Sequence, residues 1–194
     1  IIFNGNGYSD EWVAEAERRG LPNIKSMVAA VETLTTDKSV KLFERFGIFT
    51  KAELESRAEV LYETYAKTIN IEALTMVDMA SKQIIPAVIT YATELAASIN
   101  EVTAALPDAD VSVQTELLTE TQALLSDTKV ALAKLTDVQA KGAAMPDGKE
   151  QAEYYRDVVK TAMDELRAPV DKLEMIVDKE IWPLPSYGDL MFEV

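Results

Sequence analysis

The side chains that most often carry out chemistry are missing from this sequence or stand in patterns that do not form a site. The 194 residues contain no histidine and no cysteine, which excludes the commonest general base, the zinc ligand sets and Glu-x-x-His di-iron sites. No stretch matches the P-loop, the GxSxG nucleophile elbow or the HExxH zinc motif. Asp108-x-Asp110-x-Ser112 imitates the start of an EF-hand, but the sixth loop position is Val113 and the twelfth is Thr119, where calcium binding needs glycine and glutamate. We therefore predict no catalytic, cofactor-binding or metal-binding residue in this chain.

Three other stretches have the residue types of a site but are better explained by structure. The run Asn4–Gly7 contains Gly5-Asn6-Gly7, which could cradle a phosphate, although two Asn-Gly pairs are first of all turn signals. The run Tyr154-Tyr155-Arg156-Asp157 resembles a site, but tyrosines at the end of a helical bundle usually cap its core. The acidic clusters Glu53-Leu54-Glu55 and Asp164-Glu165 are expected to be solvated helix faces.

Composition indicates a folded, acidic, helical protein. Apolar residues make up 48% of the chain, and there are only seven glycines and seven prolines, which argues against disorder and against an all-β fold. The net charge of −14 opposes binding to nucleic acids and to anionic membranes. The sequence has no transmembrane run and no signal peptide, and the lack of cysteine is compatible with a cytoplasmic location. Because it begins IIFNGNG without Met, we expect a piece of a longer protein.

The element around which the chain is organised is a long helix predicted from Ile71 to Leu106. Apolar residues recur there every three or four positions, with one gap filled by Ser81, which is the period of a helix with one buried stripe. Pro86 lies within it, so we expect a kink near Gln83. The predicted stripe is Leu74, Val77, Ile84, Val88, Ala92, Leu95, Ile99, Val102 and Leu106.

Two further long helices are predicted as partners for this rod, from about Ser112 to Ala140 and from about Lys149 to Ile181, the last kinked at Pro169. Short turns at Leu106–Asp110 and Gly142–Gly148 make consecutive helices antiparallel neighbours. The fold class is therefore all-α: a long antiparallel three-helix bundle over residues 71–181, with a smaller helical region at one end. The predicted stripes are Leu117, Thr121, Leu124, Thr128, Ala131, Leu135 and Val138 in the second helix, and Tyr155, Val159, Ala162, Leu166, Val170, Leu173 and Val177 in the third.

Residues 1–70 are predicted to form short helices, with Ile1–Phe3 as a candidate strand. Helices are expected at Ser9–Arg19, at about Ser26–Leu34, and from Thr36 or Asp37 to Gly47. Thr50-x-x-Glu53 is a capping box that opens a further helix. The β-branched patch Thr68–Ile71 could break that helix before the long rod or only weaken it, and the sequence leaves both readings open.

The last segment, residues 182–194, carries six large apolar side chains in a short stretch stiffened by Pro183 and Pro185. Leaving these side chains in water would be costly, so we expect a docking tail. It could dock on this chain's own core, along Ser9–Tyr65, or on a missing domain or neighbouring subunit. With the third helix ending at Ile181, the tail should begin beside the start of the first rod. The six side chains are Trp182, Leu184, Tyr187, Leu190, Met191 and Phe192.

Four runs resemble the C-terminal part of type III glutamine synthetases and together cover most of the chain. They are FNGNGYSDEWVAEAERRGLPN, TKAELESRAEVLYETYAKTINIEALTMVDMASKQIIPAV, YYRDVVKTAMDELRAPVDKLE and the terminal IWPLPSYGDLMFEV. A shorter similarity to ordinary bacterial glutamine synthetases lies in Leu21-Pro22, in Phe43-x-x-Phe46-Gly47-Ile48-Phe49-Thr50 and in the last five residues. On that alignment the long bundle is an insertion before a shared tail.

The resemblance implies that the parent enzyme is an ATP-dependent glutamate–ammonia ligase that uses Mg²⁺ or Mn²⁺ and assembles as a homo-oligomer of rings. The family's metal ligands, phosphate-binding arginines and catalytic loops match no position here, so no catalytic residue is carried over, and we expect this piece alone to be inactive. Its role would be folding and oligomer assembly beside an upstream catalytic domain, with no nucleic acid or membrane as partner. The alternative is a free-standing acidic helical bundle that serves as a protein-interaction module.

Overall fold

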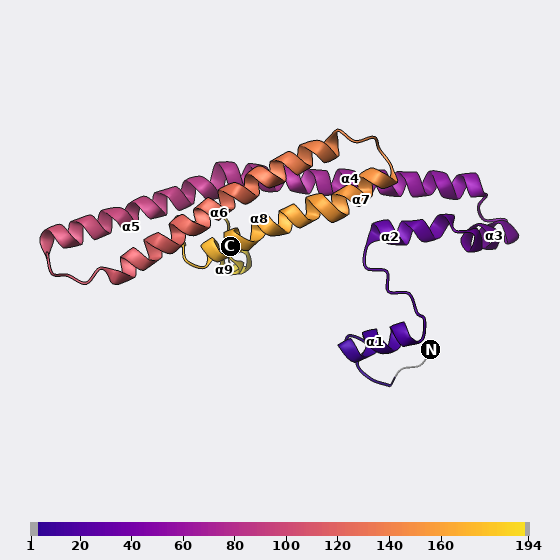
Figure 1. Ribbon diagram of the computed structural model, residues 1–194, viewed down its shortest axis with the longest axis horizontal. Coiled ribbons are helices and arrows are strands. Elements are labelled where there is room, and N and C mark those ends of the chain that lie inside the picture. The colour runs from indigo at the N-terminus through magenta and orange to yellow at the C-terminus, as the bar shows by residue number, and fades with distance from the viewer. Residues whose placement is uncertain (1–3, 193–194) are drawn as a thin grey trace. The chain divides into compact units, whose positions relative to one another are not determined.

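The computed structural model describes residues 4–192, which form helices and loops and contain no strand (Figure 1). The all-α prediction is confirmed for this range, whereas the strand predicted at Ile1–Phe3 lies outside it. The chain divides into two compact units, one up to Tyr65 and one from Ala66 onward, and each is described here by itself.

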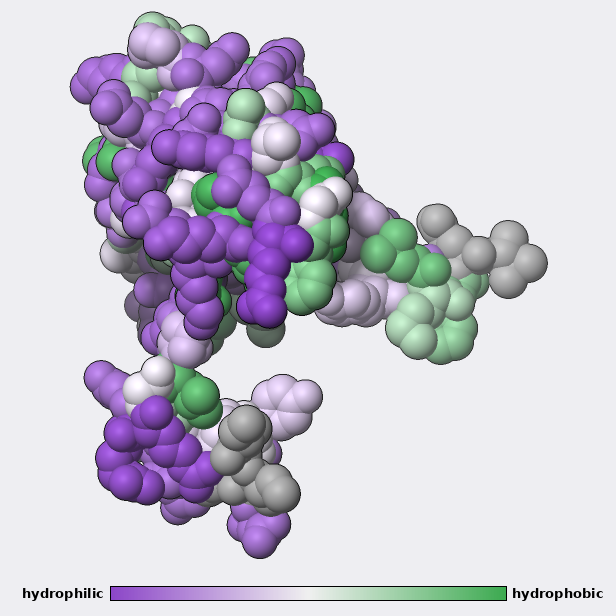
Figure 2. Space-filling model, turned by 90° about the vertical axis from the view of Figure 1, so that its right-hand side faces the viewer, coloured by the Kyte–Doolittle hydropathy of each residue, from purple (hydrophilic) through white to green (hydrophobic). Residues whose placement is uncertain are grey.

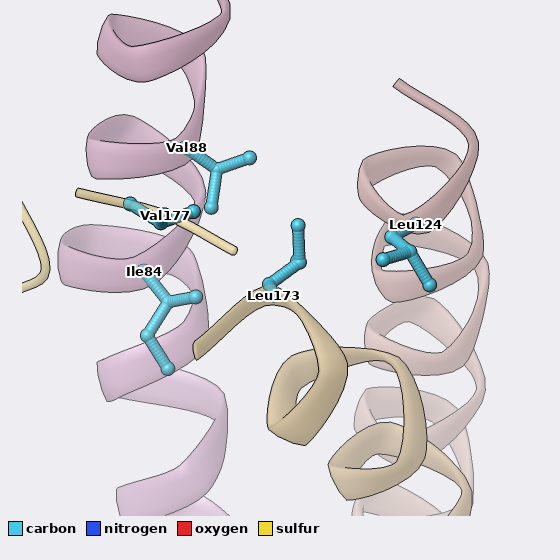
Figure 3. Packing of buried hydrophobic residues seen from close by; sticks show 5 residues of the cluster. All are labelled: Ile84, Val88, Leu124, Leu173 and Val177. Atoms are coloured by element: carbon cyan, nitrogen blue, oxygen red, sulfur yellow. The ribbon is translucent and has the colours of Figure 1, made fainter. Parts of the chain in front are cut away.

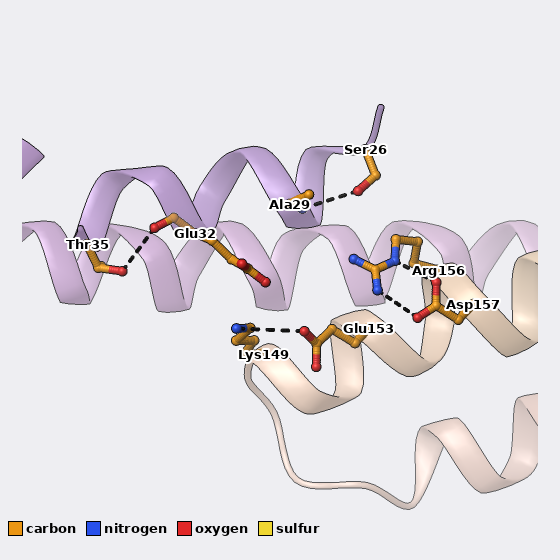
Figure 4. Close-up of polar contacts among 8 residues, drawn as sticks. All are labelled: Ser26, Ala29, Glu32, Thr35, Lys149, Glu153, Arg156 and Asp157. Atoms are coloured by element: carbon orange, nitrogen blue, oxygen red, sulfur yellow. Dashed lines mark hydrogen bonds and ion pairs between the residues drawn. The ribbon is translucent and has the colours of Figure 1, made fainter. Parts of the chain in front are cut away.

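The first unit begins with three short helices whose ends follow the sequence signals. They are α1 (Asp10–Arg18), α2 (Met27–Glu32), which continues into the 3₁₀ turn η1 (Thr33–Thr35), and α3 (Asp37–Arg45). Each has a hydroxyl residue as N-cap that accepts a backbone N–H three residues on, as Ser26 does from Ala29 in Figure 4. Gly20 and Gly47 follow α1 and α3 with φ of 69° and 63°, a left-handed conformation that glycine adopts without strain.

A capping box then opens the longest helix of the protein. The Thr50 N–H donates to Glu53 Oε2 at 2.7 Å, and the Glu53 N–H donates back to Thr50 Oγ1 at 3.4 Å. The helix runs as α4 (Lys51–Met79), passes through a π-helical segment, η2 (Ala80–Ile84), and continues as α5 (Ile85–Ala105). The patch at Thr68–Ile71 therefore does not break it.

The π-helical segment corrects the predicted buried stripe. It lies where a kink near Gln83 was expected, and Pro86 follows it in the first turn of α5, where a missing N–H costs little. A π turn holds one extra residue, so the buried face before it moves by one position. Ala73 is 0% exposed and Ala80 is buried, whereas the predicted stripe residues Leu74, at 47% exposure, and Ser81 are exposed.

The second and third long helices complete the bundle in the second unit. Helix α6 (Ser112–Ala143) runs antiparallel to α5 and packs against both α5 and α8 (Figure 1). The third rod consists of α7 (Lys149–Tyr154), a second π-helical segment η3 (Tyr155–Val159) and α8 (Lys160–Glu174). The predicted stripe of α6 is largely confirmed, since its buried residues are Thr121, Leu124, Thr128, Leu132, Leu135, Val138 and Gly142.

Two details of the third rod differ from prediction. Pro169 lies inside the α-helical stretch α8 and is buried, and a π-helical turn that was not predicted lies earlier in the rod, at η3. The rod also ends at Glu174 and not at Ile181, because the chain turns through residues 175–181 to place Ile176, Val177 and Ile181 on the core.

This early end decides where the tail begins. Leu173 and Val177 pack with Ile84 and Val88 of the first rod and with Leu124 of α6 (Figure 3). Trp182 and Leu184 lie on this same cluster. The tail therefore starts against the middle of the bundle, and the prediction that it starts beside the beginning of the first rod is wrong. It ends in the short helix α9 (Tyr187–Phe192).

Candidate functional site

The turn at Asn4–Gly7, the one loop with a weak phosphate-binding signal, leads into the Ser9 cap of helix α1. The Asn6 carbonyl accepts the Ser9 N–H at 3.2 Å and the Ser9 hydroxyl at 2.9 Å, and Asn6 Oδ1 accepts the Tyr8 N–H at 3.0 Å. Ser9 Oγ in turn accepts the Trp12 N–H at the start of α1. These bonds hold a local turn, as the two Asn-Gly pairs predicted.

The acidic clusters and the EF-hand-like run behave as surface. Glu53 caps α4, and Glu165 pairs with Lys134 of α6. Asp110 Oδ1 accepts the Ser112 N–H at 2.9 Å, which forms a local Asx-type turn and not a metal loop. Within residues 4–192 no three acidic side chains gather closely enough to hold a metal ion.

A partly buried polar network joins all three rods near the turn between α6 and α7. Asn70 Oδ1 of α4 accepts two bonds, from Gln139 Nε2 of α6 at 2.8 Å and from the Tyr155 hydroxyl at 2.9 Å. Tyr155 is 1% exposed, and its burial, with the neighbouring Tyr154, raises the pKa of its phenol above the ordinary value. The prediction that this tyrosine caps the core is confirmed, and Arg156 and Asp157 form a surface ion pair (Figure 4).

Gln151 fixes the turn itself. Its amide nitrogen donates to the Gly142 carbonyl in the last turn of α6 at 3.1 Å and to the Met145 carbonyl just after this helix at 3.2 Å. Gly142 lets the rings of Tyr154 and Tyr155 lie close to the α6 main chain. A Cβ at this position would lie 3.1 Å from the Tyr155 ring and 3.2 Å from the Tyr154 ring. Gln151 is only 7% exposed, so its orientation is set by these bonds and by packing.

A small cavity of about 170 Å³ opens beside this network, and we call it the amide cavity. It is lined by Ala66, Lys67, Asn70, Ala143, Asp147, Gln151 and Tyr155. Sequence analysis did not identify it. The available signal was weak: single amide residues, Asn70, Gln139 and Gln151, stand in otherwise regular helical runs.

The second notable surface is the helix α9 at the end of the described chain. Its N-terminus is closed by reciprocal bonds, since the Ser186 N–H donates to Asp189 Oδ2 at 2.7 Å and the Asp189 N–H donates to Ser186 Oγ at 3.3 Å. Lys179 Nζ binds the other carboxylate oxygen of Asp189 at 2.8 Å. Lys179 and Ser186 together hold the pKa of the Asp189 carboxyl well below its usual range.

This anchored helix leaves its apolar side chains uncovered. In Figure 2 the segment that carries α9 projects from the bundle with hydrophobic atoms in view. Phe192 is 78% exposed. Trp182 and Leu184, which lie five and three residues before the helix, are half-buried on the core. The large side chains of α9 that remain exposed are Tyr187, Leu190, Met191 and Phe192.

Comparison with known proteins shows the family to which this chain is related. The family model described as the glutamine synthetase C-terminal domain matches residues 1–103. The chain belongs to the glutamine synthetase C-terminal domain family. The sequence-based resemblance is thereby confirmed.

Glutamine synthetases of three organisms are similar over the whole chain or nearly so. Those from Butyrivibrio fibrisolvens and Bacteroides fragilis are 37% identical over 194 residues and 33% identical over 196 residues. A type-3 glutamine synthetase from Dictyostelium discoideum is 30% identical over 200 residues. These alignments cover 99–100% of this chain but only 27–28% of each relative, so the chain spans little more than a quarter of their length. Within the described range, no helix is long and apolar enough to cross a membrane.

Proposed function

We propose that this chain is the C-terminal helical region of an ATP-dependent glutamate–ammonia ligase, and that it serves folding and oligomer assembly rather than the chemical step. In this proposal a preceding part of the same cytoplasmic chain carries the catalytic domain, with ATP and Mg²⁺ or Mn²⁺. The family membership and the type-3 relative support the enzyme class.

The observation that carries the assembly role is the exposed apolar face of α9. Fully burying a large apolar side chain contributes roughly 1.5–3 kcal/mol, yet four of them stay in water on a helix that Ser186, Asp189 and Lys179 hold in place. A helix that is anchored and still exposed is suited to a partner surface. We assign that surface to a neighbouring subunit, in line with the ring oligomers that the resemblance implies.

Complementation between two separate pieces tests this role. The upstream part of the glutamine synthetase chain would be expressed alone, and this 194-residue chain would then be added to it. We expect neither piece alone to make glutamine, and the mixture to regain activity and a large sedimentation coefficient.

A matched variant with Leu190→Ser, Met191→Ser and Phe192→Ser should restore much less. Val130→Ser is the control, because Val130 is an equally exposed but isolated apolar residue on α6. Glutamine formation by this chain alone, or full assembly of the upstream part without it, would refute the proposal.

A further inference from the structure

The amide cavity presents polar groups that protein atoms do not saturate. The Gln151 side-chain amide nitrogen donates two hydrogen bonds to main-chain carbonyls, so Oε1 of the same amide faces away from these carbonyls. Among the residues that the structure describes, none donates to this oxygen. Gln151 is less than one-tenth exposed and lines the cavity, so a bound donor would satisfy an acceptor that is otherwise left to water.

Asn70 supplies the complementary group on the opposite rod. Its Oδ1 is occupied by the donors of Gln139 and Tyr155, which leaves its Nδ2 hydrogens for another partner. No described acceptor receives them. The cavity therefore has an amide donor and an amide acceptor on its wall, and a primary carboxamide matches both, because its carbonyl accepts while its N–H donates.

The cavity also carries one positive and one negative side chain, Lys67 and Asp147. An ammonium group has three donors, so Lys67 can bind a carboxylate in addition to any partner within the protein. The Asp147 carboxylate can accept hydrogen bonds from a ligand's ammonium group. It is exposed and therefore accessible to a ligand from solvent. Opposite charges on one small cavity favour a zwitterion over an anion such as a nucleotide.

The volume of the amide cavity also fits a small zwitterion. A cavity of about 170 Å³ has room for several water molecules, which is the scale of a free amino acid rather than of a nucleotide. We propose that the amide cavity binds a small α-amino acid with a carboxamide side chain. The carboxamide pairs with Asn70 Nδ2 and Gln151 Oε1, and the zwitterionic end binds Lys67 and Asp147.

Calorimetric titration of the 194-residue protein tests this site independently of any enzymatic activity. The probes are L-glutamine, L-asparagine, L-glutamate and propionamide. We expect saturable binding of at least one of the two amide amino acids. The affinity for L-glutamate should be lower by about tenfold or more, because its carboxylate offers no donor to Gln151 Oε1. Propionamide should bind weakly for want of the charged end.

Asn70→Asp is the decisive variant, because it keeps an acceptor oxygen for Gln139 and Tyr155 and replaces the Nδ2 donor by a charged oxygen that can only accept. It should abolish amide binding while the far-ultraviolet CD spectrum is unchanged. Asp147→Asn should weaken binding several-fold, and Glu150→Gln, a neighbouring exposed carboxylate outside the cavity, should not.

Three results would overturn the proposal: no binding of either amide amino acid to the wild-type protein, undiminished binding to Asn70→Asp, or tighter binding of L-glutamate than of L-glutamine. If Asn70→Asp alters the CD spectrum, Asp147→Asn decides alone, since its exposed side chain has little part in folding. Unchanged affinity in that variant then counts against the site.

Discussion

Large apolar side chains are buried in the bundle core but exposed on the helix α9. Leu173 is fully buried among Ile84, Val88 and Leu124, whereas Leu190 on α9 is exposed. The boundary between the two environments falls inside the tail, since Trp182 and Leu184 lie on the core and α9 does not. Large apolar residues in one short segment can therefore serve two purposes, the first pair for the fold and the second group for a partner.

Leu173→Ala should have the largest effect on stability. Truncating a buried leucine removes its transfer free energy and leaves a cavity, so we expect a loss of about 2–5 kcal/mol in the free energy of unfolding by urea denaturation. Met175→Ala, two residues later and 83% exposed, is the control and should change stability by less than about 0.5 kcal/mol. Equal losses in the two variants would mean that this cluster is not a core.

Trp182→Ala should lower the free energy of unfolding by less, for the number of atoms removed, than Leu173→Ala does. Trp182 is only half-buried, so we expect about 2 kcal/mol, below the roughly 3–5 kcal/mol of a fully buried tryptophan. Its Nε1 is buried without a hydrogen-bond partner in the described structure, and Trp182→Phe removes that unpaired donor. Thermal denaturation should therefore rank Trp182→Phe above Trp182→Ala, and a neutral Trp182→Ala would show that the tail does not dock on its own chain.

Leu190→Ser and Phe192→Ser should barely change the stability of this chain. Neither side chain is covered, so the free energy of unfolding should stay within about 0.5 kcal/mol of wild type. A loss comparable to that of Trp182→Ala would mean that α9 folds back onto the chain in solution, and the contrast between the two halves of the tail would disappear.

The smallest predicted effect concerns the bond that anchors α9. Because the pKa of Asp189 is depressed by Lys179 and Ser186, this contribution is present above the unfolded value of about 3.9. It is lost only as pH falls through the still lower folded value. Amide exchange of Leu190 and Met191 should thus be equally protected at pH 5 and pH 8 after correction for intrinsic rates. Asp189→Asn should reduce this protection at both pH values, and unaltered protection would show that the carboxylate does not anchor the helix.

Helix ends and the bundle were predictable because their signals are local. Each helix start is marked by a cap that forms a hydrogen bond with a residue three positions away. These caps are Ser9, Ser26, Thr36 and the Thr50–Glu53 box. The stripes of α6 and of the third rod follow from the helical period alone.

The irregular turns and the amide cavity were not predictable because they depend on contacts across the bundle. Pro86 marked the first π-helical segment, but the one-residue shift that exposes Leu74 and buries Ala73 cannot be read from the proline alone. Pro169, by contrast, lies within an α-helical stretch and not in a π-helical one. The segment at Tyr155–Val159 has no proline, and the bonds that join Tyr155, Asn70 and Gln139 span 69 and 85 residues of sequence.

Paired truncations test the division of the tail most directly. One chain would end at Ser186, which removes α9, and the other at Ile181, which also removes Trp182 and Leu184. Melting temperature would be measured on this chain, and sedimentation velocity on the proposed full-length enzyme carrying the same truncations. We predict that the chain ending at Ser186 keeps its melting temperature while the enzyme falls to smaller species, and that the chain ending at Ile181 loses both. An enzyme that ends at Ser186 and still sediments as the wild-type oligomer would contradict the assembly role of α9.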